Sequence, residues 1–173
     1  MLCQFLFRNF ESYRDETIFD MQAEHLQEFP DSLITFDKAG SLLPVSVIYG
    51  PNGGGKTNLL RALTALVSII VSPIRELGSA RIPPVIQQKA DATPFAFDEE
   101  SKREPTEFRI FFRRNEYEYS YYIALTQGTV VAESLQRKQL GGKRPAHIFD
   151  RKNQDVTLGP SLRKLNLTGV LFR

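Results

Sequence analysis

One stretch of the sequence combines the residue types that bind phosphate. It runs Gly50-Pro51-Asn52-Gly53-Gly54-Gly55-Lys56-Thr57 and matches the pattern G-x-x-x-x-G-K-[ST]. A triphosphate needs many N–H donors at close range, and glycines allow the backbone conformations with φ > 0 that gather them. The lysine ammonium can then reach the β- and γ-phosphates, and the threonine hydroxyl can complete the coordination of a bridging Mg²⁺. The loop therefore predicts a site for a nucleoside triphosphate with Mg²⁺.

The residues beside this loop predict the strand and the helix that such a site requires. Val45-Ser46-Val47-Ile48-Tyr49 is a nearly continuous apolar run, typical of a strand buried on both faces of a mostly parallel sheet. After the loop, apolar residues at three- and four-residue intervals predict a helix from about Lys56 to Val71, which Pro73 should end. These residues are Leu59, Leu60, Leu63, Leu66, Val67 and Ile70. This context favours nucleotide binding over a chance match.

The rest of the chain predicts mainly strands. Apolar runs at 2–10, 17–21 and 32–36 precede the loop, whereas residues 72–106 are rich in proline and charge and predict an irregular insertion. From Glu107 the pattern alternates, with turns expected at 114–115 and 127–128 and short strands at 130–132, 146–149 and 155–158, so we expect an antiparallel meander. A row of tyrosines, Tyr117, Tyr119 and Tyr121, could stack nucleic-acid bases, but such rows are more often the packing face of a sheet.

Composition limits the class of protein. The chain has 173 residues, of which 42 % are hydrophobic, enough for the core of one domain. It has neither an apolar stretch of about 20 residues nor the pattern of a signal peptide, so we expect a cytoplasmic protein without a membrane partner. The single cysteine, Cys3, excludes an internal disulfide and a cysteine-cluster zinc site, and we expect it to be a small buried residue.

Charge is distributed unevenly along the chain. Residues 134–173 contain nine Lys and Arg against two Asp and Glu, although the whole chain carries a formal charge of only +2. This asymmetry suits a polyanionic partner such as DNA. A solvated surface whose acidic complement lies elsewhere in the fold or on a missing segment is the favoured interpretation.

Two segments carry a resemblance to a known group of ATPases. The loop with its continuation, Asn58-Leu59-Leu60-Arg61-Ala62-Leu63, resembles the ABC-type heads of the RecF and SMC group. Phe7-Arg8-Asn9-Phe10-Glu11-Ser12-Tyr13-Arg14 is similar to the opening strand of those proteins, which lies near the nucleotide. The resemblance implies an ABC-type head lobe of the P-loop NTPase class, α/β, with a core sheet, a P-loop helix and an antiparallel β-subdomain. It implies nucleotide contacts by Asn58 and by Arg14, although a surface arginine is an equal alternative for Arg14.

Further segments resemble a narrower family. Residues 97–101, 104–108 and 131–135 are similar to the AAA-type, OLD-like ATPases encoded in bacterial phage-defence operons. This resemblance implies ATP and Mg²⁺ as cofactors, a homodimer in the full-length protein, a nuclease partner and a role in antiviral defence. No Asn-Lys-x-Asp pattern for guanine is present, which also favours ATP.

The sequence departs from the ABC-type heads in the motifs that serve catalysis. An ABC-type head also needs a Walker B strand ending in Asp-Glu, a signature motif and a switch histidine. Phe95-Ala96-Phe97-Asp98-Glu99 imitates Walker B, but Pro94 precedes it and charges follow, so we expect a strand that borders a loop. His25 and His147 have no nearby carboxylate pattern and are interpreted as ordinary histidines.

These departures favour one interpretation and leave two others open. We expect residues 1–173 to be a single N-terminal ATPase lobe of a longer chain, which binds ATP but hydrolyses it only in the full-length protein. One alternative is a complete small P-loop kinase, which would show a parallel sheet with helices on both faces. The other is a non-catalytic interaction module gated by nucleotide.

Overall fold

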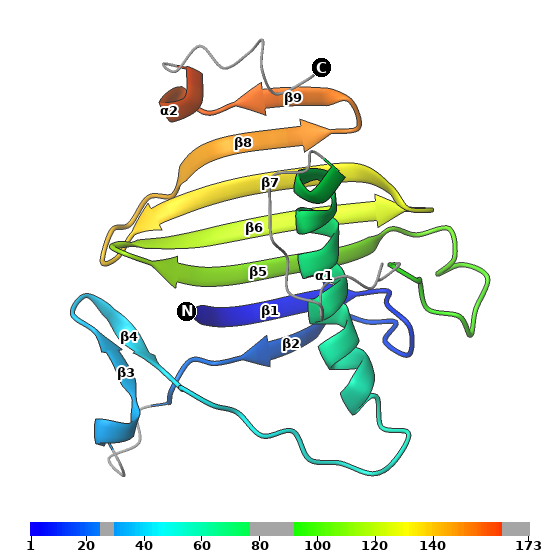
Figure 1. The fold of residues 1–173 in the computed structure, drawn as a ribbon, viewed down its shortest axis with the longest axis horizontal. Coiled ribbons are helices and arrows are strands. Elements are labelled where there is room, and N and C mark those ends of the chain that lie inside the picture. The colour runs from blue at the N-terminus through cyan, green and yellow to red at the C-terminus, as the bar shows by residue number, and fades with distance from the viewer. Residues whose placement is uncertain (25–29, 77–91, 164–173) are drawn as a thin grey trace.

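A single antiparallel sheet dominates the fold. The computed structural model describes residues 1–24, 30–76 and 92–163. Seven strands pair in the order β2-β1-β5-β6-β7-β8-β9, and each neighbouring pair is antiparallel. They are β1 (Leu2–Arg8), β2 (Thr17–Asp20), β5 (Thr106–Arg114), β6 (Tyr117–Thr126), β7 (Thr129–Gln139), β8 (Ala146–Lys152) and β9 (Asp155–Leu158). One long helix, α1 (Lys56–Glu76), crosses one face of this sheet (Figure 1).

Smaller elements lie around the sheet. A 3-10 turn (Pro30–Ser32) precedes a hairpin of β3 (Ile34–Phe36) and β4 (Ala39–Leu42), which stands beside one end of the sheet (Figure 1). A short helix, α2 (Pro160–Arg163), follows β9. The sequence patterns predicted neither β4 nor α2. The residues of β4, Ala-Gly-Ser-Leu, include no β-branched or aromatic side chain, and the four residues of α2 are too few to show a helical period.

The predicted meander is confirmed. Strands β5 to β9 follow one another in the sheet in chain order. Asn115 has φ of 53°, and Gln127 and Gly128 have φ of 51° and 76°. Positive φ values suit the tight hairpin turns that match the twist of the flanking strands, and Asn and Gly adopt them most readily.

The strand predicted at 45–49 is wrong. This segment is irregular, and Val45, Val47 and Tyr49 are 69 %, 64 % and 87 % exposed. A strand needs a neighbour for its backbone N–H and C=O groups, and the described residues give this segment none. The predicted division into a core sheet and a separate antiparallel β-subdomain is therefore replaced by one antiparallel sheet.

Helix α1 starts at Lys56, as predicted, but continues past Pro73 to Glu76. A proline within a helix lacks the N–H that would bond to the carbonyl four residues earlier, so one backbone hydrogen bond is lost. Because α1 ends three residues after Pro73, only the last turn of the helix is affected. Of the predicted apolar stripe, Leu59 and Leu66 are buried, whereas Leu60 is 57 % exposed.

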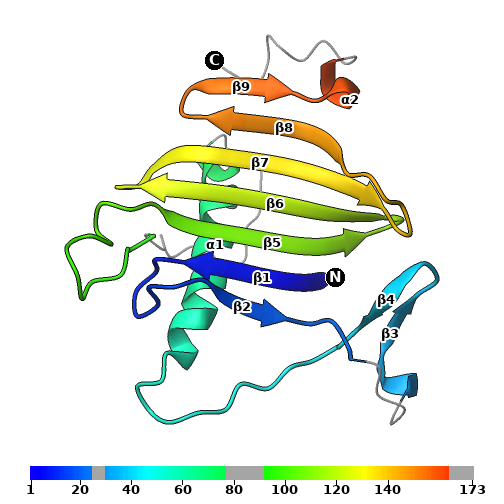
Figure 2. The ribbon, with the colours of Figure 1, turned by 180° about the vertical axis from the view of Figure 1, so that it is seen from behind.

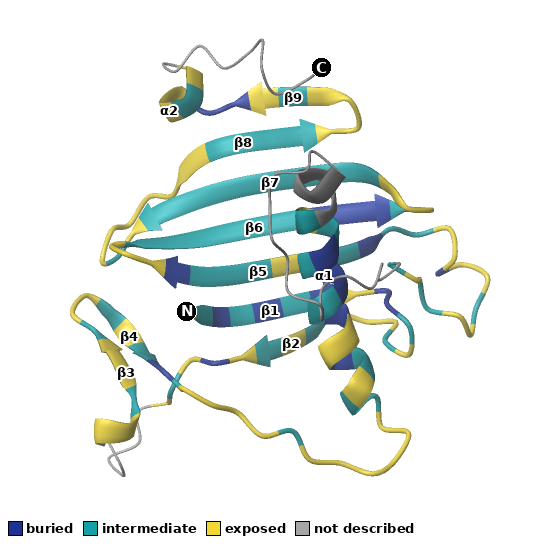
Figure 3. Ribbon diagram, viewed as in Figure 1, coloured by how far each residue is buried: buried dark blue, intermediate teal, exposed yellow. Residues whose placement is uncertain are grey.

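The core lies between α1 and one face of the sheet. Ala62 and Ala65 are fully buried, and their small side chains let the helix approach the strands closely. Opposite them lie the phenylalanines of β1 and β5: the rings of Phe5 and Phe108 stack with centroids 6.3 Å apart. Burial is concentrated where α1 crosses the sheet (Figure 3). The face of the sheet that α1 covers thus holds the core of the molecule.

The tyrosine row lies on this same face and packs within the sheet. Tyr119 stacks on Phe112 with ring centroids 5.1 Å apart, and Tyr121 donates a hydrogen bond of 2.8 Å to Glu133. The guanidinium of Arg137 lies 4.9 Å from the centre of the Tyr117 ring. These contacts favour the packing interpretation of the row. Cys3 is also buried, as expected, and its burial raises the pKa of the thiol.

Candidate nucleotide-binding site

The phosphate loop bends through its glycines. Gly53 and Gly55 both have φ of 82°, a left-handed conformation that favours glycine. A bond from the Gly54 N–H to the Pro51 carbonyl (3.2 Å) closes a turn between them. At Gly55 a side chain would also collide with Tyr13, whose hydroxyl oxygen lies 2.9 Å from the place of a Cβ. The glycine pattern therefore reflects both backbone conformation and close packing.

The loop and the first helical turn present backbone donors without an acceptor. The N–H groups of Asn58 and Leu59 bond to the Gly55 carbonyl at 2.8 Å and 3.1 Å, which starts the helix. In contrast, the N–H groups of Gly53, Gly55, Lys56 and Thr57 have no acceptor in the described part of the chain. The positive end of the dipole of α1 lies at the same place. This combination suits an anion.

The two polar side chains of the motif also lie at this loop. The ammonium of Lys56 donates to the carbonyls of Gly50 (2.6 Å) and Pro51 (2.7 Å), so it lies over the loop. The side chain of Thr57 is exposed and bonds to no other residue among those described. A compact cation and an available hydroxyl are the groups that phosphate oxygens and a bridging Mg²⁺ require.

Residues 9–14 contact the phosphate loop and the first turns of α1. The Tyr13 hydroxyl donates to the Gly55 carbonyl (3.2 Å), and the Asn58 side chain donates to the Ser12 hydroxyl (2.9 Å). Arg61 in α1 forms an ion pair with Glu11 at 3.3 Å. Asn58, predicted to contact nucleotide, thus joins the helix to this segment, and its contact with nucleotide stays a prediction.

A family model described as "AAA domain, putative AbiEii toxin, Type IV TA system" matches residues 45–161. This match covers more than half of the chain and contains the whole phosphate loop. The chain belongs to this AAA-domain family. It is therefore a P-loop ATPase domain that binds nucleotide, typically with Mg²⁺. The free amides, Lys56 and Thr57 fit those ligands. No curated protein matches the chain significantly.

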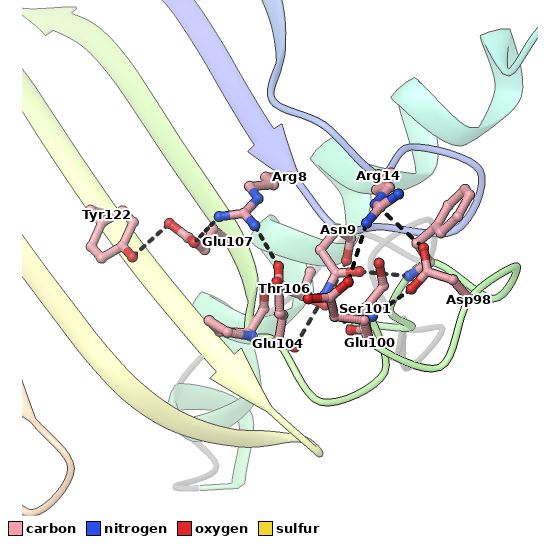
Figure 4. A network of polar contacts seen from close by, with 12 residues as sticks. Arg8, Asn9, Arg14, Asp98, Glu100, Ser101, Glu104, Thr106, Glu107 and Tyr122 are labelled. Atoms are coloured by element: carbon pink, nitrogen blue, oxygen red, sulfur yellow. Dashed lines mark hydrogen bonds and ion pairs between the residues drawn. The ribbon is translucent and has the colours of Figure 1, made fainter.

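Arg14 in this AAA domain contacts carboxylates. Its guanidinium lies 3.4 Å from Asp98 and 3.5 Å from Glu100, and its side chain is 54 % exposed (Figure 4). The contact with phosphate or adenine that the resemblance implies stays a prediction, since it would require Arg14 to leave these partners or to share them.

The segment that imitates Walker B is a loop in this AAA domain. Residues 95–99 form no strand, so the predicted loop-bordering strand is wrong, and Phe97 is 81 % exposed. Asp98 accepts a bond of 2.6 Å from the Ser101 N–H, and this bond, more than the nearby Arg14, lowers the pKa of its carboxyl. Proline and the turn-forming charged residues override the short apolar run. Within the predicted insertion, residues 72–76 belong to α1, residues 77–91 lie outside the described part, and residues 92–105 are irregular.

Asn9 joins this loop to β1, a role that the sequence patterns missed. It is 1 % exposed with φ of 52°, and its side-chain NH₂ donates to the carbonyls of Ser101 (2.7 Å), Glu104 (3.0 Å) and Pro105 (3.3 Å). Its side-chain oxygen accepts from the N–H of Phe95 at 2.9 Å (Figure 4). Asn9 stands in the segment 7–14 that resembles the opening strand of the RecF and SMC group, and this resemblance was the available indication.

Two further expectations concern histidines and membranes. His147 does have a carboxylate neighbour, Asp150 at 3.0 Å, contrary to the expectation; the two lie three residues apart on β8. His25 lies outside the described residues. Among the described helices, none is long and apolar enough to span a membrane.

Proposed function

We propose that this AAA domain binds ATP with Mg²⁺ through residues 50–57 and serves as the N-terminal lobe of an ABC- or SMC-like ATPase. One observation carries the proposal: the backbone N–H groups of Gly53, Gly55, Lys56 and Thr57, all in the loop or the first helical turn, have no acceptor among the described residues. Unpaired amides at a helix start are a ready site for phosphate oxygens. Lys56 would exchange its two carbonyl contacts for the β- and γ-phosphates, and Thr57 would hold Mg²⁺.

Exposed apolar residues support the proposal of a lobe within a larger ATPase. Val45, Val47 and Tyr49 precede the loop, and Leu60 lies on α1, each more than half exposed. Several exposed apolar side chains in one short segment are consistent with a surface that another part of the protein covers. We propose that the covering part supplies the acidic residue and the signature motif that hydrolysis needs, and that two full-length copies form a homodimer.

The proposed biological setting rests on the family. A role in bacterial anti-phage defence, in the cytoplasm and with a nuclease partner, is loosely compatible with the toxin–antitoxin description of the matching family. The rival kinase function receives no support, because the described sheet is antiparallel and α1 crosses only one of its faces. A nucleotide-gated interaction module remains the alternative if ATP binds but is never hydrolysed.

Binding of a fluorescent ATP analogue with Mg²⁺ tests the site. Removing the Lys56 ammonium in Lys56→Ala should weaken binding at least tenfold, because a charge-assisted bond to phosphate is lost. Lys152→Ala is the matched control: it removes an exposed lysine of β8 that forms no described ion pair, and we expect wild-type affinity. Equal affinity of Lys56→Ala and the wild type would refute the site.

Steady-state phosphate release tests the proposal of a lobe. Transfer of the phosphoryl group to water needs a positioned nucleophile and charge neutralisation beyond the loop. We therefore expect residues 1–173 alone to bind nucleotide with turnover near the background rate. Brisk turnover that Lys56→Ala abolishes would mean that this chain contains its own catalytic residues.

A further inference from the structure

A second surface lies on the sheet face opposite α1. The view in Figure 2 looks onto this face, with α1 behind the sheet. It carries an open hollow of about 420 Å³ over β5, β6 and β7. Residues opposite one another in a ladder share a face, so the pairing registers show how the side chains of the hollow are arranged.

The centre of the hollow is an aromatic and amide row. Phe111 in β5 lies opposite Ser120 in β6, which lies opposite Gln136 in β7. All three side chains are half-buried and line the hollow. No ring contact covers Phe111 in the described part of the chain. This row thus offers one flat apolar surface beside a hydroxyl and an amide.

Cationic rows flank this centre on both sides. On one side, the guanidinium of Arg109 lies 5.1 Å from the centre of the Tyr122 ring, which lies opposite it. On the other side, Glu118 lies opposite Lys138. Rows two residues apart along a strand are separated by roughly 7 Å, so each cationic row is one step from the central row. Lys143, in the loop after β7, also lines the hollow.

The charges of the hollow are not balanced. Glu118, the one carboxylate among the described residues that line it, is shared by Lys138 and by Arg113, each at 3.2 Å. Arg109 and Lys143 have no carboxylate partner among the described residues. Arg137 is also at the hollow, but its guanidinium lies over Tyr117. The hollow therefore carries a net positive charge.

Two other carboxylates on this face have partners among the described residues. Glu107 faces Arg8 at 3.6 Å and accepts a bond from the Tyr122 hydroxyl, and Asp150 pairs with His147. They leave Arg109 and Lys143 available to an anion from outside. The basic segment 134–173 is thus partly neutralised within the fold, since Lys138 pairs with Glu118 and Arg151 lies 3.7 Å from Glu133.

We propose that this hollow binds single-stranded nucleic acid. Arg109, Lys138 and Lys143 would contact phosphates, while a base would stack on Phe111 and bond to Ser120 or Gln136. Charge complementarity selects a polyanion, and an aromatic ring between cationic rows selects a strand with unpaired bases. In a duplex the base faces are stacked on one another, so the central row would remain unused.

Fluorescence anisotropy with a labelled 20-nucleotide oligo-dT tests the proposal, with no ATP present. The double variant Arg109→Ala/Lys143→Ala should bind at least tenfold more weakly and lower the slope of log K against log salt by about 1.4, since each phosphate contact contributes roughly 0.7. Arg114→Ala is the matched control. Arg114 is an exposed arginine of β5 that lies opposite Tyr117 on the other face, and we expect wild-type binding.

Phe111→Leu tests the stacking step while it keeps an apolar side chain in the sheet. It should weaken oligo-dT binding between about fivefold and a hundredfold, the range expected for one stacked base, and leave binding of heparin unchanged. Circular dichroism checks the fold of each variant. Tighter binding of a 20-base-pair duplex than of oligo-dT, or unchanged affinity of the folded double variant, would refute the proposal. Lys56→Ala should bind oligo-dT with wild-type affinity. Failure of the nucleic-acid proposal can therefore be distinguished from failure of the ATP-site proposal.

Discussion

Two glycines of the phosphate loop share a backbone conformation but differ in their surroundings. Gly53 and Gly55 both have φ of 82°, yet a Cβ at Gly53 would meet nothing within 4 Å, whereas one at Gly55 would lie 2.9 Å from the Tyr13 hydroxyl. An alanine at either position is strained by about 1 kcal/mol. Only at Gly55 is the strain joined by a clash that displaces the loop.

We therefore expect Gly55→Ala to weaken binding of the ATP analogue more than Gly53→Ala does, by at least a further threefold. The reason is that Tyr13 is also fixed by its edge-on contact with Phe7, with ring centroids 4.9 Å apart, so it cannot easily yield. Titration of both variants with the analogue provides the measurement. A larger loss in Gly53→Ala would show that close packing against Tyr13 is unimportant.

Thr57 should act through Mg²⁺ alone. Its hydroxyl has no bond to the rest of the described chain, so Thr57→Ala removes no protein contact. We expect Thr57→Ala to lower affinity for the analogue with Mg²⁺ about tenfold, and to leave affinity in EDTA unchanged. Thr57→Ser, which keeps the hydroxyl, serves as the control. Equal losses with and without Mg²⁺ would assign Thr57 to another role.

At the scale of elements, Asn9 fixes the loop 93–105 to the end of β1. Its buried side chain satisfies three carbonyls and one N–H. Asn9→Ala would remove the partner of these buried and partly buried groups, and we expect a loss of roughly 2–4 kcal/mol in the free energy of unfolding. Urea unfolding measures it.

Asn153→Ala is the control for backbone conformation. Asn153 has the same φ of 52° but is exposed in a turn, so it should lose only about 1 kcal/mol or less. If both variants lost the same amount, the network of Asn9 would contribute nothing beyond the left-handed conformation.

The phosphate loop, the start of α1 and the meander could be predicted from sequence because each depends on local rules. Glycine spacing, three- and four-residue periodicity and two-residue alternation act within a short stretch. Val45–Tyr49 could not be predicted in this way: an apolar run becomes a strand only if a neighbour is present to pair with it. The role of Asn9 also escaped prediction, because its partners lie more than 80 residues away along the chain.

The two faces of the seven-stranded sheet carry different groups. The face under α1 supports the phosphate loop through the aromatic core, and the opposite face holds polar and charged rows. Two tyrosine hydroxyls, one on each face, donate to carboxylates: Tyr121 to Glu133 and Tyr122 to Glu107, both at 2.8 Å. These two hydrogen bonds join β6 to its neighbours, to β7 on one face and to β5 on the other. Both bonds require a protonated tyrosine hydroxyl.

This dependence predicts a loss of stability at alkaline pH. Burial, followed by the hydrogen bond to Glu107, raises the pKa of Tyr122 to about 12, and burial likewise raises the pKa of Tyr121. In the unfolded chain a tyrosine titrates near 10. Because the folded state holds the proton more tightly, this stabilisation is complete below about pH 10 and is lost as pH rises towards 12.

Urea unfolding of the wild type and Tyr122→Phe between pH 8 and 11.5 measures this loss. Tyr122→Phe should be less stable at pH 8, because it lacks the bond to Glu107, and its stability should fall less steeply above pH 10. The difference in slope should be at most about 1.4 kcal/mol per pH unit, and smaller because solvent screens the partly exposed pair. Parallel slopes would mean that Tyr122 ionises alike in both states and does not contribute to the loss of stability at alkaline pH.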